Sequence, residues 1–210
     1  MTATNPDQRL HFPATARNLE PIGDVLQKWL PNCGTILEIA SGSGEHAVEF
    51  QQRFSHLRWQ ASDPDPQHRE SINAWIRHTD QTNTMARALD IDVAQHPWPL
   101  PTDVQACLSA IVCINLLHIS SKNCTAALLQ QAAECLPEQA PLMIYGPFKQ
   151  YGAHTSLSNA SFDASLRERN IDWGVRDIEW IESLITTLPL RLMKCKTMQA
   201  NNQMLILIHE

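Results

Sequence analysis

The fold of this chain is decided by the stretch Ile36-Leu-Glu-Ile-Ala-Ser-Gly-Ser-Gly-Glu-His46. It begins inside a short apolar run, Thr35–Ile39, that predicts a buried strand, and it ends where an amphipathic helix is expected over residues 45–54. Between them, Gly42 and Gly44 allow a tight turn and let a ligand approach main-chain amides that a Cβ would block. A strand, a glycine loop and a helix in this order are typical of nucleotide-binding α/β proteins.

Apolar runs that predict strands recur along the chain and alternate with amphipathic patterns that predict helices, such as residues 21–30 and 69–78. This alternation predicts a parallel sheet with helical crossovers. The last two strands are joined by the short polar turn 199–202, so we expect them to pair antiparallel. The predicted strands are Thr35–Ile39, 57–61, 87–91, 108–115, 142–145, 190–198 and Gln203–His209.

We therefore expect an α/β, Rossmann-like class I methyltransferase fold, with a mostly parallel seven-stranded sheet that ends in an antiparallel hairpin. Most NAD-binding Rossmann domains lack that terminal hairpin. Residues 1–16 are expected to be an irregular N-terminal segment, and residues 17–210 to form a single domain. A chain of 210 residues with 43% hydrophobic residues can bury one core of substantial size.

The composition argues against several classes of partner. The chain has 16 basic and 22 acidic residues, whereas proteins that bind the nucleic-acid backbone usually carry a basic surplus. It has no apolar run near the roughly 20 residues that span a bilayer, and no secretory signal is visible at its start. Its six cysteines show neither CxxC nor zinc-ligand spacing. We expect a cytoplasmic protein without nucleic-acid, membrane or metal partners, and the oligomeric state stays open.

Two carboxylates distinguish between the cofactors that the glycine loop could bind. The loop pattern G-x-G-x-x-A suits a dinucleotide equally well. Glu38, inside the preceding strand, would face a pyrophosphate unfavourably but suits the ammonium group of an amino-acid cofactor. Asp63 ends the next strand, where a carboxylate can accept both ribose hydroxyls. Together they favour S-adenosylmethionine over NAD, with Ala40, Gly42 and Gly44 forming the loop, although Glu38 could be a salt-bridged group and Asp63 a turn former.

Further side chains are expected near the adenine and the transferred methyl group. Asp90 and Asp92 lie at the end of the third predicted strand and point the same way, so either, with Asp92 preferred, could accept the adenine amino group. Asn115 ends the fourth strand, beside the expected position of the methyl group. His118 is the candidate general base, because imidazole titrates near neutral pH, and Tyr145 could position or deprotonate an acceptor. Either of the last two could instead be structural.

Ordered motifs along most of the chain carry a family resemblance. They are Arg17-Asn18, Pro21-Ile22, Leu37-Glu-Ile-Ala-Ser-Gly-Ser-Gly-Glu-His-Ala47, Trp59-Gln-Ala-Ser-Asp-Pro-Asp65, Ile114-Asn-Leu-Leu-His-Ile119, Tyr145-Gly-Pro-Phe148, Ser158-Asn159, Phe162-Asp163, Trp173-Gly-Val-Arg-Asp177 and Ala200-Asn-Asn202. With them the chain resembles a family of class I methyltransferase-like proteins, described in bacteria as a domain of unknown function and in eukaryotes as methyltransferase-like. The resemblance implies the fold and S-adenosylmethionine as the cofactor, but it brings no substrate.

The resemblance motifs also suggest where an acceptor could bind. Asn18, Asn159 and Arg176 are polar motif residues that could line an acceptor pocket, although Arg176 could equally form an ion pair at a helix start. The chain departs from the family pattern at Ser120-Ser-Lys122, where Ser-Pro-Trp is usual, and at Pro137-Glu-Gln-Ala140, where a glycine-rich turn is usual. Both departures concern loop shape, the first of them near the expected active site.

The sequence therefore predicts an S-adenosylmethionine-dependent methyltransferase that acts on a small-molecule acceptor. The motif Asn115-Leu-Leu-His118 is not the Asn/Asp-Pro-Pro-Tyr loop used on planar amino groups, which argues against methylation of nucleic-acid bases. A non-catalytic S-adenosylmethionine-binding or interaction protein is the main alternative, because the chain lacks a family-defining catalytic residue. An NAD(P)-dependent oxidoreductase is a remote alternative.

Overall fold

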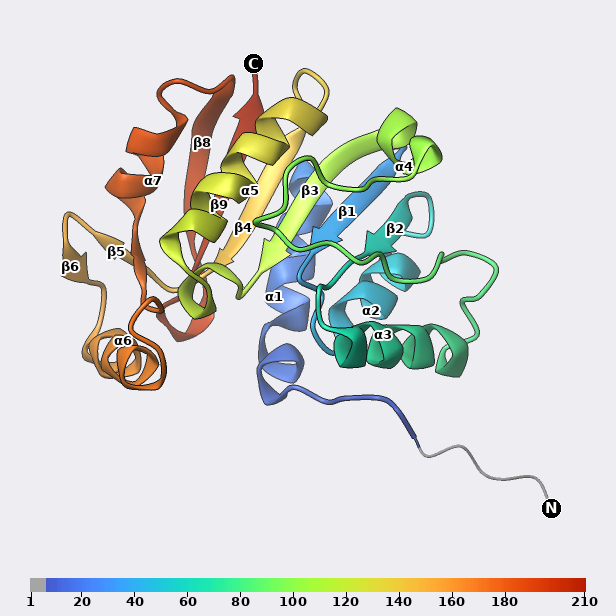
Figure 1. Ribbon diagram of the computed structural model, residues 1–210, viewed down its shortest axis with the longest axis horizontal. Coiled ribbons are helices and arrows are strands. Elements are labelled where there is room, and N and C mark those ends of the chain that lie inside the picture. The colour runs from blue at the N-terminus through green and yellow to red at the C-terminus, as the bar shows by residue number, and fades with distance from the viewer. Residues whose placement is uncertain (1–6) are drawn as a thin grey trace.

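The computed structural model describes residues 7–210 and contains a mixed six-stranded sheet (Figure 1). The strand order is β2-β1-β3-β4-β9-β8, with β1 to β4 parallel and β9 antiparallel to both β4 and β8. The expected α/β architecture and its terminal antiparallel hairpin are confirmed. The strands are β1 (Thr35–Ile39), β2 (Arg58–Ala61), β3 (Leu108–Ile114), β4 (Pro141–Gly146), β8 (Leu190–Thr197) and β9 (Gln203–His209).

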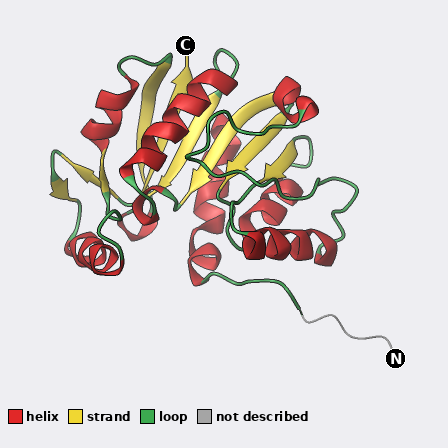
Figure 2. Ribbon diagram, viewed as in Figure 1, coloured by secondary structure: helices red, strands yellow, loops and turns green. Residues whose placement is uncertain are grey.

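Helices cover both faces of this sheet, so β1 is buried along its whole length (Figure 2). Alternate strand residues enter opposite cores: Ile36 packs with α1, α2 and α3, whereas Leu37 packs with α5 and α7. No helix within residues 7–210 is both long and apolar enough to cross a membrane. The helices on these faces are α1 (Pro13–Trp29), α2 (Glu45–Arg53) and α3 (Pro66–His78), then α5 (Lys122–Cys135) and α7 (Ile178–Ile185), with the short α4 (Thr102–Cys107) before β3.

A second, smaller unit lies beside the main sheet, and the sequence pattern did not predict it. It consists of α6 (Leu157–Arg169) and a three-stranded sheet in the order β6-β5-β7. The buried carboxylate of Asp163 holds it together, because it accepts from the backbone N–H of Val175 at 2.7 Å and forms ion pairs with Arg167, His154 and Lys149. The strands are β5 (Phe148–Gln150), β6 (Ala153–His154) and β7 (Arg176–Asp177).

The expectation of seven strands is wrong, because the predicted strand 87–91 is reduced to one parallel bridge between Ser62 and Leu89. The neighbours of Leu89 are held elsewhere. The backbone N–H of Ala88 donates to Asn73 Oδ1 at 3.0 Å, and Asp90 pairs with Arg69 at 3.0 Å, both partners lying on α3. A single bridge therefore stands where a regular edge strand was expected, and the residues on either side of Leu89 are held by α3.

The first helix is longer than the predicted range 21–30, since α1 begins at Pro13 and contains Pro21 in its interior. Proline suits the first turn of a helix, and two prolines in one segment leave the start ambiguous from sequence alone. Residues 13–16 of the expected irregular segment are therefore helical, and residues 7–12 precede the helix without regular structure. The expectation for residues 1–6 lies outside the described residues.

Candidate cofactor and acceptor site

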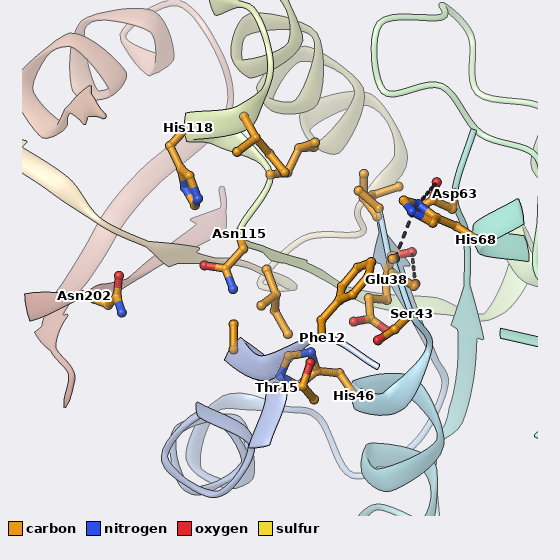
Figure 3. A pocket seen from close by; sticks show the side chains of 18 of the residues that line it. Phe12, Thr15, Glu38, Ser43, His46, Asp63, His68, Asn115, His118 and Asn202 are labelled. Atoms are coloured by element: carbon orange, nitrogen blue, oxygen red, sulfur yellow. Dashed lines mark hydrogen bonds and ion pairs between the residues drawn. The ribbon is translucent and has the colours of Figure 1, made fainter. Parts of the chain in front are cut away.

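A cavity of about 750 Å³ opens at the carboxyl ends of β1, β2 and β3 (Figure 3). The loops after these strands form one wall, and the start of α1, the first half of α6 and the turn at Asn202 complete it. Ligands of open parallel sheets bind at this edge. The predicted site residues that line the cavity are Glu38, Ala40, Gly42, Asp63, Asn115, His118 and Asn159.

The backbone beside the cavity has several residues with positive φ. Gly42 and Gly44 have φ of 58° and 92°, which favours glycine, and a Cβ on Gly44 would lie 2.7 Å from the Cα of Ile72. Gly44 is therefore needed for the contact between the loop and α3 and does not itself line the cavity. Ala40 and Asn115 have φ of 56° and 60°, a conformation that costs an alanine about 1–2 kcal/mol. Two of the seven described non-glycine residues with positive φ thus lie where β1 and β3 meet the cavity.

Glu38 is a buried acid in the cavity wall. It is 1% exposed, and its Oε2 accepts a hydrogen bond from the indole Nε1 of Trp59 at 2.9 Å. Burial raises the pKa of Glu38 to about 7; hydrogen bonds from Trp59 and Ser41 oppose the rise, and repulsion by Asp63 adds to it. A cation that entered the cavity beside this carboxyl would favour its ionised form.

Asp63 connects the glycine loop to the start of α3. Its Oδ2 accepts from the backbone N–H of Gly42 at 2.9 Å, and its Oδ1 accepts from the backbone N–H of Asp65 at 3.0 Å. His68 Nδ1 lies 3.1 Å from the same Oδ1, as Figure 3 shows. The carboxylate thus forms a turn and also lines the cavity, so the two interpretations of Asp63 from the sequence are compatible.

The expected adenine contact of Asp92 is not supported by its position. Its side chain is exposed and caps the backbone N–H of Ala94 at 2.9 Å, and Asp90 pairs with Arg69. Ile91 and Val93 line the cavity instead. Asp90 and Asp92 do point the same way, but that direction is toward solvent, because the alternate residues are held in the core.

His118 reaches the cavity from the 3₁₀ turn Leu117–Ile119 that follows β3. Its ring lies edge-on to that of Phe162 on α6, with centroids 5.4 Å apart. Burial, together with the positive charges of Arg176 and Arg169, lowers the pKa of His118 to about 4. The imidazole is therefore neutral at pH 7. An efficient general base has a pKa near the working pH, so His118 is a weak base at pH 7.

Tyr145 and Asn18 lie behind the cavity wall. Tyr145 is 3% exposed, and burial raises its pKa, with the side chains of Asn18 and Asn202 acting against the rise. Asn18 is also buried, and its Oδ1 lies 2.8 Å from Nε2 of His46. Neither side chain lines the cavity, because the face of α1 that carries Asn18 packs onto the sheet. A direct contact of Asn18 or Tyr145 with an acceptor is therefore not supported.

Arg176 and Asn159 have structural contacts that the sequence did not reveal. The guanidinium of Arg176 donates to the backbone carbonyls of Leu117, Ser120 and Asp172, so it holds the loop that carries His118 rather than lining the cavity. Asn159 does line the cavity, and its Nδ2 donates to the backbone carbonyl of Asn201 at 2.9 Å. Arg176 is therefore not placed to contact an acceptor, as the sequence had suggested; it supports the loop that carries His118.

Phe12 is a cavity residue that sequence reasoning missed. Its ring would lie 2.9 Å from a Cβ on Gly42, and its backbone N–H donates to Glu45 Oε2 at 2.9 Å. The preceding Leu10 is also held, since its N–H donates to Ser71 Oγ and its carbonyl accepts from Trp75 Nε1. The sequence feature that could have indicated this role is the aromatic residue immediately before Pro13, in a mostly polar segment.

Residues 9–209 match a family model described as "Protein of unknown function (DUF938)", which is almost the whole chain. The chain belongs to the DUF938 family. The methyltransferase-like family inferred from the motifs agrees with this assignment.

Solved methyltransferase structures share the fold of the chain. An O-methyltransferase family protein from Burkholderia thailandensis matches with a TM-score of 0.76 and 15% identity, over 94% of this chain and 57% of that one. Human N-acetylserotonin methyltransferase, solved with SAM, matches at 0.72 and 12%, over 93% and 52%. Geranyl diphosphate C-methyltransferase from Streptomyces coelicolor matches at 0.71 and 10%, over 93% and 80%. The chain spans little more than half the length of the first two, and identities this low show the fold alone.

Proposed function

We propose that this DUF938 protein is an S-adenosylmethionine-dependent methyltransferase that acts on a small-molecule acceptor. The observation that carries the proposal is the pair of carboxyl groups, Glu38 and Asp63, at either side of the positive-φ glycine loop in the cavity. S-adenosylmethionine brings an ammonium and a sulfonium together with one carboxylate, whereas a dinucleotide would bring an anionic pyrophosphate toward Glu38. Asp63 suits the ribose of either cofactor, so the discrimination rests on Glu38. The carboxyl groups of this cavity therefore fit S-adenosylmethionine better than NAD.

Residues from β1 and from four loops would hold the cofactor. Glu38 would face the ammonium group and Asp63 the ribose hydroxyls, with the backbone of Ala40 and Gly42 beside them. Ile91 and Val93 supply the apolar surface on which an adenine ring can lie. Asn115, held at positive φ by the end of β3, carries its amide into the middle of the cavity (Figure 3).

When bound, the cofactor supplies a methyl group on a sulfonium, which is already a good leaving group. The protein's contribution is to hold the acceptor in line and to exclude water. Phe12 covers the glycine-loop end, and Phe162 lies against the His118 end. His118, neutral at pH 7, can accept or donate one hydrogen bond to the acceptor atom.

Two measurements test this proposal. By calorimetry the purified protein should bind S-adenosylhomocysteine and not NAD. With S-adenosylmethionine carrying a labelled methyl group, it should label at least one compound in a bacterial metabolite extract. Tight S-adenosylhomocysteine binding without any transfer would instead support a non-catalytic binding protein, and NAD binding in its place would overturn the cofactor assignment.

The raised pKa of Glu38 predicts a pH dependence of cofactor affinity. Only the ionised carboxylate attracts the ammonium group, and a pKa of about 7 means that the ionised fraction rises from about one tenth at pH 6 to about three quarters at pH 7.5. The affinity for S-adenosylhomocysteine should therefore increase about eightfold over this interval, as measured by calorimetry at each pH.

Glu38→Gln is the control for this dependence. The amide keeps the size of the side chain and can still accept from Trp59, but it has no charge to titrate. The variant should bind more weakly at pH 7.5 and show a flat profile between pH 6 and 7.5. A profile that keeps its slope in Glu38→Gln would assign the titration to another group.

A further inference from the structure

The charged side chains of the cavity are divided between its two ends. Glu38, Asp63 and Asp65 all follow or lie within β1 and β2, at the cofactor end. Figure 3 shows Glu38 and Asp63 on one side, His118 and Asn202 on the other, and Asn115 between them. Among the described lining residues, the His118 end has no carboxylate. This end, which we call the acceptor end, is therefore not built for a cationic acceptor.

Arg17 supplies a positive charge at the acceptor end. It lies on α1, lines the cavity and is largely exposed to it. Arg17 directly precedes Asn18, which lies behind the cavity wall with Tyr145 of β4, two strands from Glu38 on β1. Within residues 7–210, no carboxylate forms an ion pair with it, whereas Arg53, Arg58 and Arg167 each have one.

The rest of the acceptor end is apolar or carries neutral amides. Leu116, Ile119, Pro147 and Phe162 offer an apolar surface, and Asn115, Asn159 and Asn202 add amide groups. Such a pocket suits an acceptor with an apolar body and one anionic group that pairs with a guanidinium.

The acceptor end is also poorly equipped to remove a proton. Apart from His68, the imidazoles that line the cavity are His118 and His46; the pKa of each is lowered to about 4, chiefly by burial, and His46 Nε2 already lies 2.8 Å from Asn18 Oδ1. Tyr145 is buried behind the wall with a raised pKa. No other ordinary base lines this end among residues 7–210. An alcohol or a protonated amine would need a base to become a nucleophile, whereas a carboxylate is already deprotonated at pH 7.

We propose that the acceptor is a small carboxylic acid with an apolar body, bound as its carboxylate between Arg17 and the amide of Asn115, and that the product is its methyl ester. The inference rests on the proposed methyltransferase function. A carboxylate oxygen forms a bond to the methyl carbon while the bond from that carbon to the sulfonium breaks, and its electron pair stays on sulfur. The products are a neutral ester and S-adenosylhomocysteine, and no proton is transferred.

The chemical stability of the labelled product tests the inference. Purified protein is incubated with methyl-labelled S-adenosylmethionine and the same metabolite extract, and in parallel with cinnamate, octanoate, cinnamyl alcohol, octanol and p-cresol as probes. A methyl ester releases its label as volatile methanol in mild alkali, whereas ethers and N- or C-methyl products keep it. We expect most of the transferred label from the extract to become volatile, and among the probes a carboxylate to be preferred over its matched alcohol.

Each other outcome has a distinct meaning. Alkali-stable label in the extract products, or a preference for an alcohol or phenol probe, overturns the carboxylate assignment and leaves the methyltransferase intact. Absence of labelled product from every mixture overturns the proposed function itself, and the inference falls with it.

Arg17→Gln tests the contact that carries the inference. Loss of a charged hydrogen bond to the carboxylate should lower kcat/KM for the labelled acceptor about 10- to 100-fold, mainly through KM. Arg17→Lys, which keeps a point charge, should recover part of the loss. S-adenosylhomocysteine affinity should not change; a large loss of that affinity would assign Arg17 to the carboxylate of the cofactor and overturn the acceptor contact.

Arg191→Gln is the matched control, since Arg191 lies on β8 and pairs with Glu210, away from the cavity. It should leave kcat/KM unchanged. If Arg17→Gln behaved like Arg191→Gln, the acceptor would not be held by its carboxylate at this position.

Discussion

Asp63→Ala should weaken S-adenosylhomocysteine binding by about 100-fold or more. The carboxylate is 4% exposed and lies where the ribose hydroxyls would reach it, and a hydrogen bond to a charged group contributes about 1.5–3 kcal/mol. Losing two such bonds costs at least about 3 kcal/mol, which corresponds to roughly 100-fold in the dissociation constant. The variant also frees the N–H of Gly42, so the loop itself becomes less fixed. Calorimetry with the ligand at fixed pH measures the effect.

Asp92→Ala is the control, because the sequence had assigned Asp92 to the adenine while its side chain is in fact exposed and caps Ala94. We expect its affinity to stay within about twofold of the parent protein, as for a surface substitution. Unchanged affinity in Asp63→Ala would remove the ribose assignment, and a large loss in Asp92→Ala would restore the original adenine contact.

Gly44→Ala should destabilise the folded protein by about 3 kcal/mol. An alanine at φ of 92° is strained, and its Cβ would lie 2.7 Å from the Cα of Ile72, a backbone atom that cannot move aside as a flexible side chain can. Left-handed strain costs about 1–2 kcal/mol, and overpacking in a tight contact about 1–3 kcal/mol. The free energy of unfolding from urea titration measures the sum.

Gly152→Ala separates the two causes. Gly152 also has positive φ, 74°, but nothing lies within 4 Å of a Cβ built there. Its alanine variant should therefore show the backbone strain alone, about 1 kcal/mol. If Gly44→Ala cost no more than Gly152→Ala, the close contact between the glycine loop and α3 would be wrong.

The glycine loop and its flanking strand and helix could be predicted because local chemistry specifies them. The apolar run of β1 and the glycines at positive φ belong to one short segment, and each points to the same turn. The terminal hairpin was equally accessible, because its polar turn fixes the pairing of β8 and β9. The edge strand 87–91 was predicted wrongly because its path depends on tertiary contacts: Asn73 and Arg69 on α3 hold Ala88 and Asp90, and a single bridge joins Leu89 to Ser62.

At the edge of the sheet, sequence position identified the neighbourhood but not the direction of each side chain. Asp92 and Tyr145 were expected at strand ends and Arg176 in a resemblance motif, yet the first points to solvent, the second is buried behind the wall and the third holds a loop. Phe12 and Arg17 were passed over, because their place in the cavity depends on how the start of the chain packs on α2 and α3.

By itself, then, the stretch from Ile36 to His46 determined a strand, a strained loop and a carboxylate at position 38, because these depend on neighbouring residues. Only the tertiary structure decided that Asp63 joins this loop, that Phe12 covers it and that Arg17 lines the cavity without a carboxylate partner among residues 7–210. Those facts depend on distances between segments far apart in the sequence. Charge and burial in a cavity are sums over such neighbours, which is why the sequence could locate Glu38 beside the glycine loop but could not assemble the lining at the other end of the cavity.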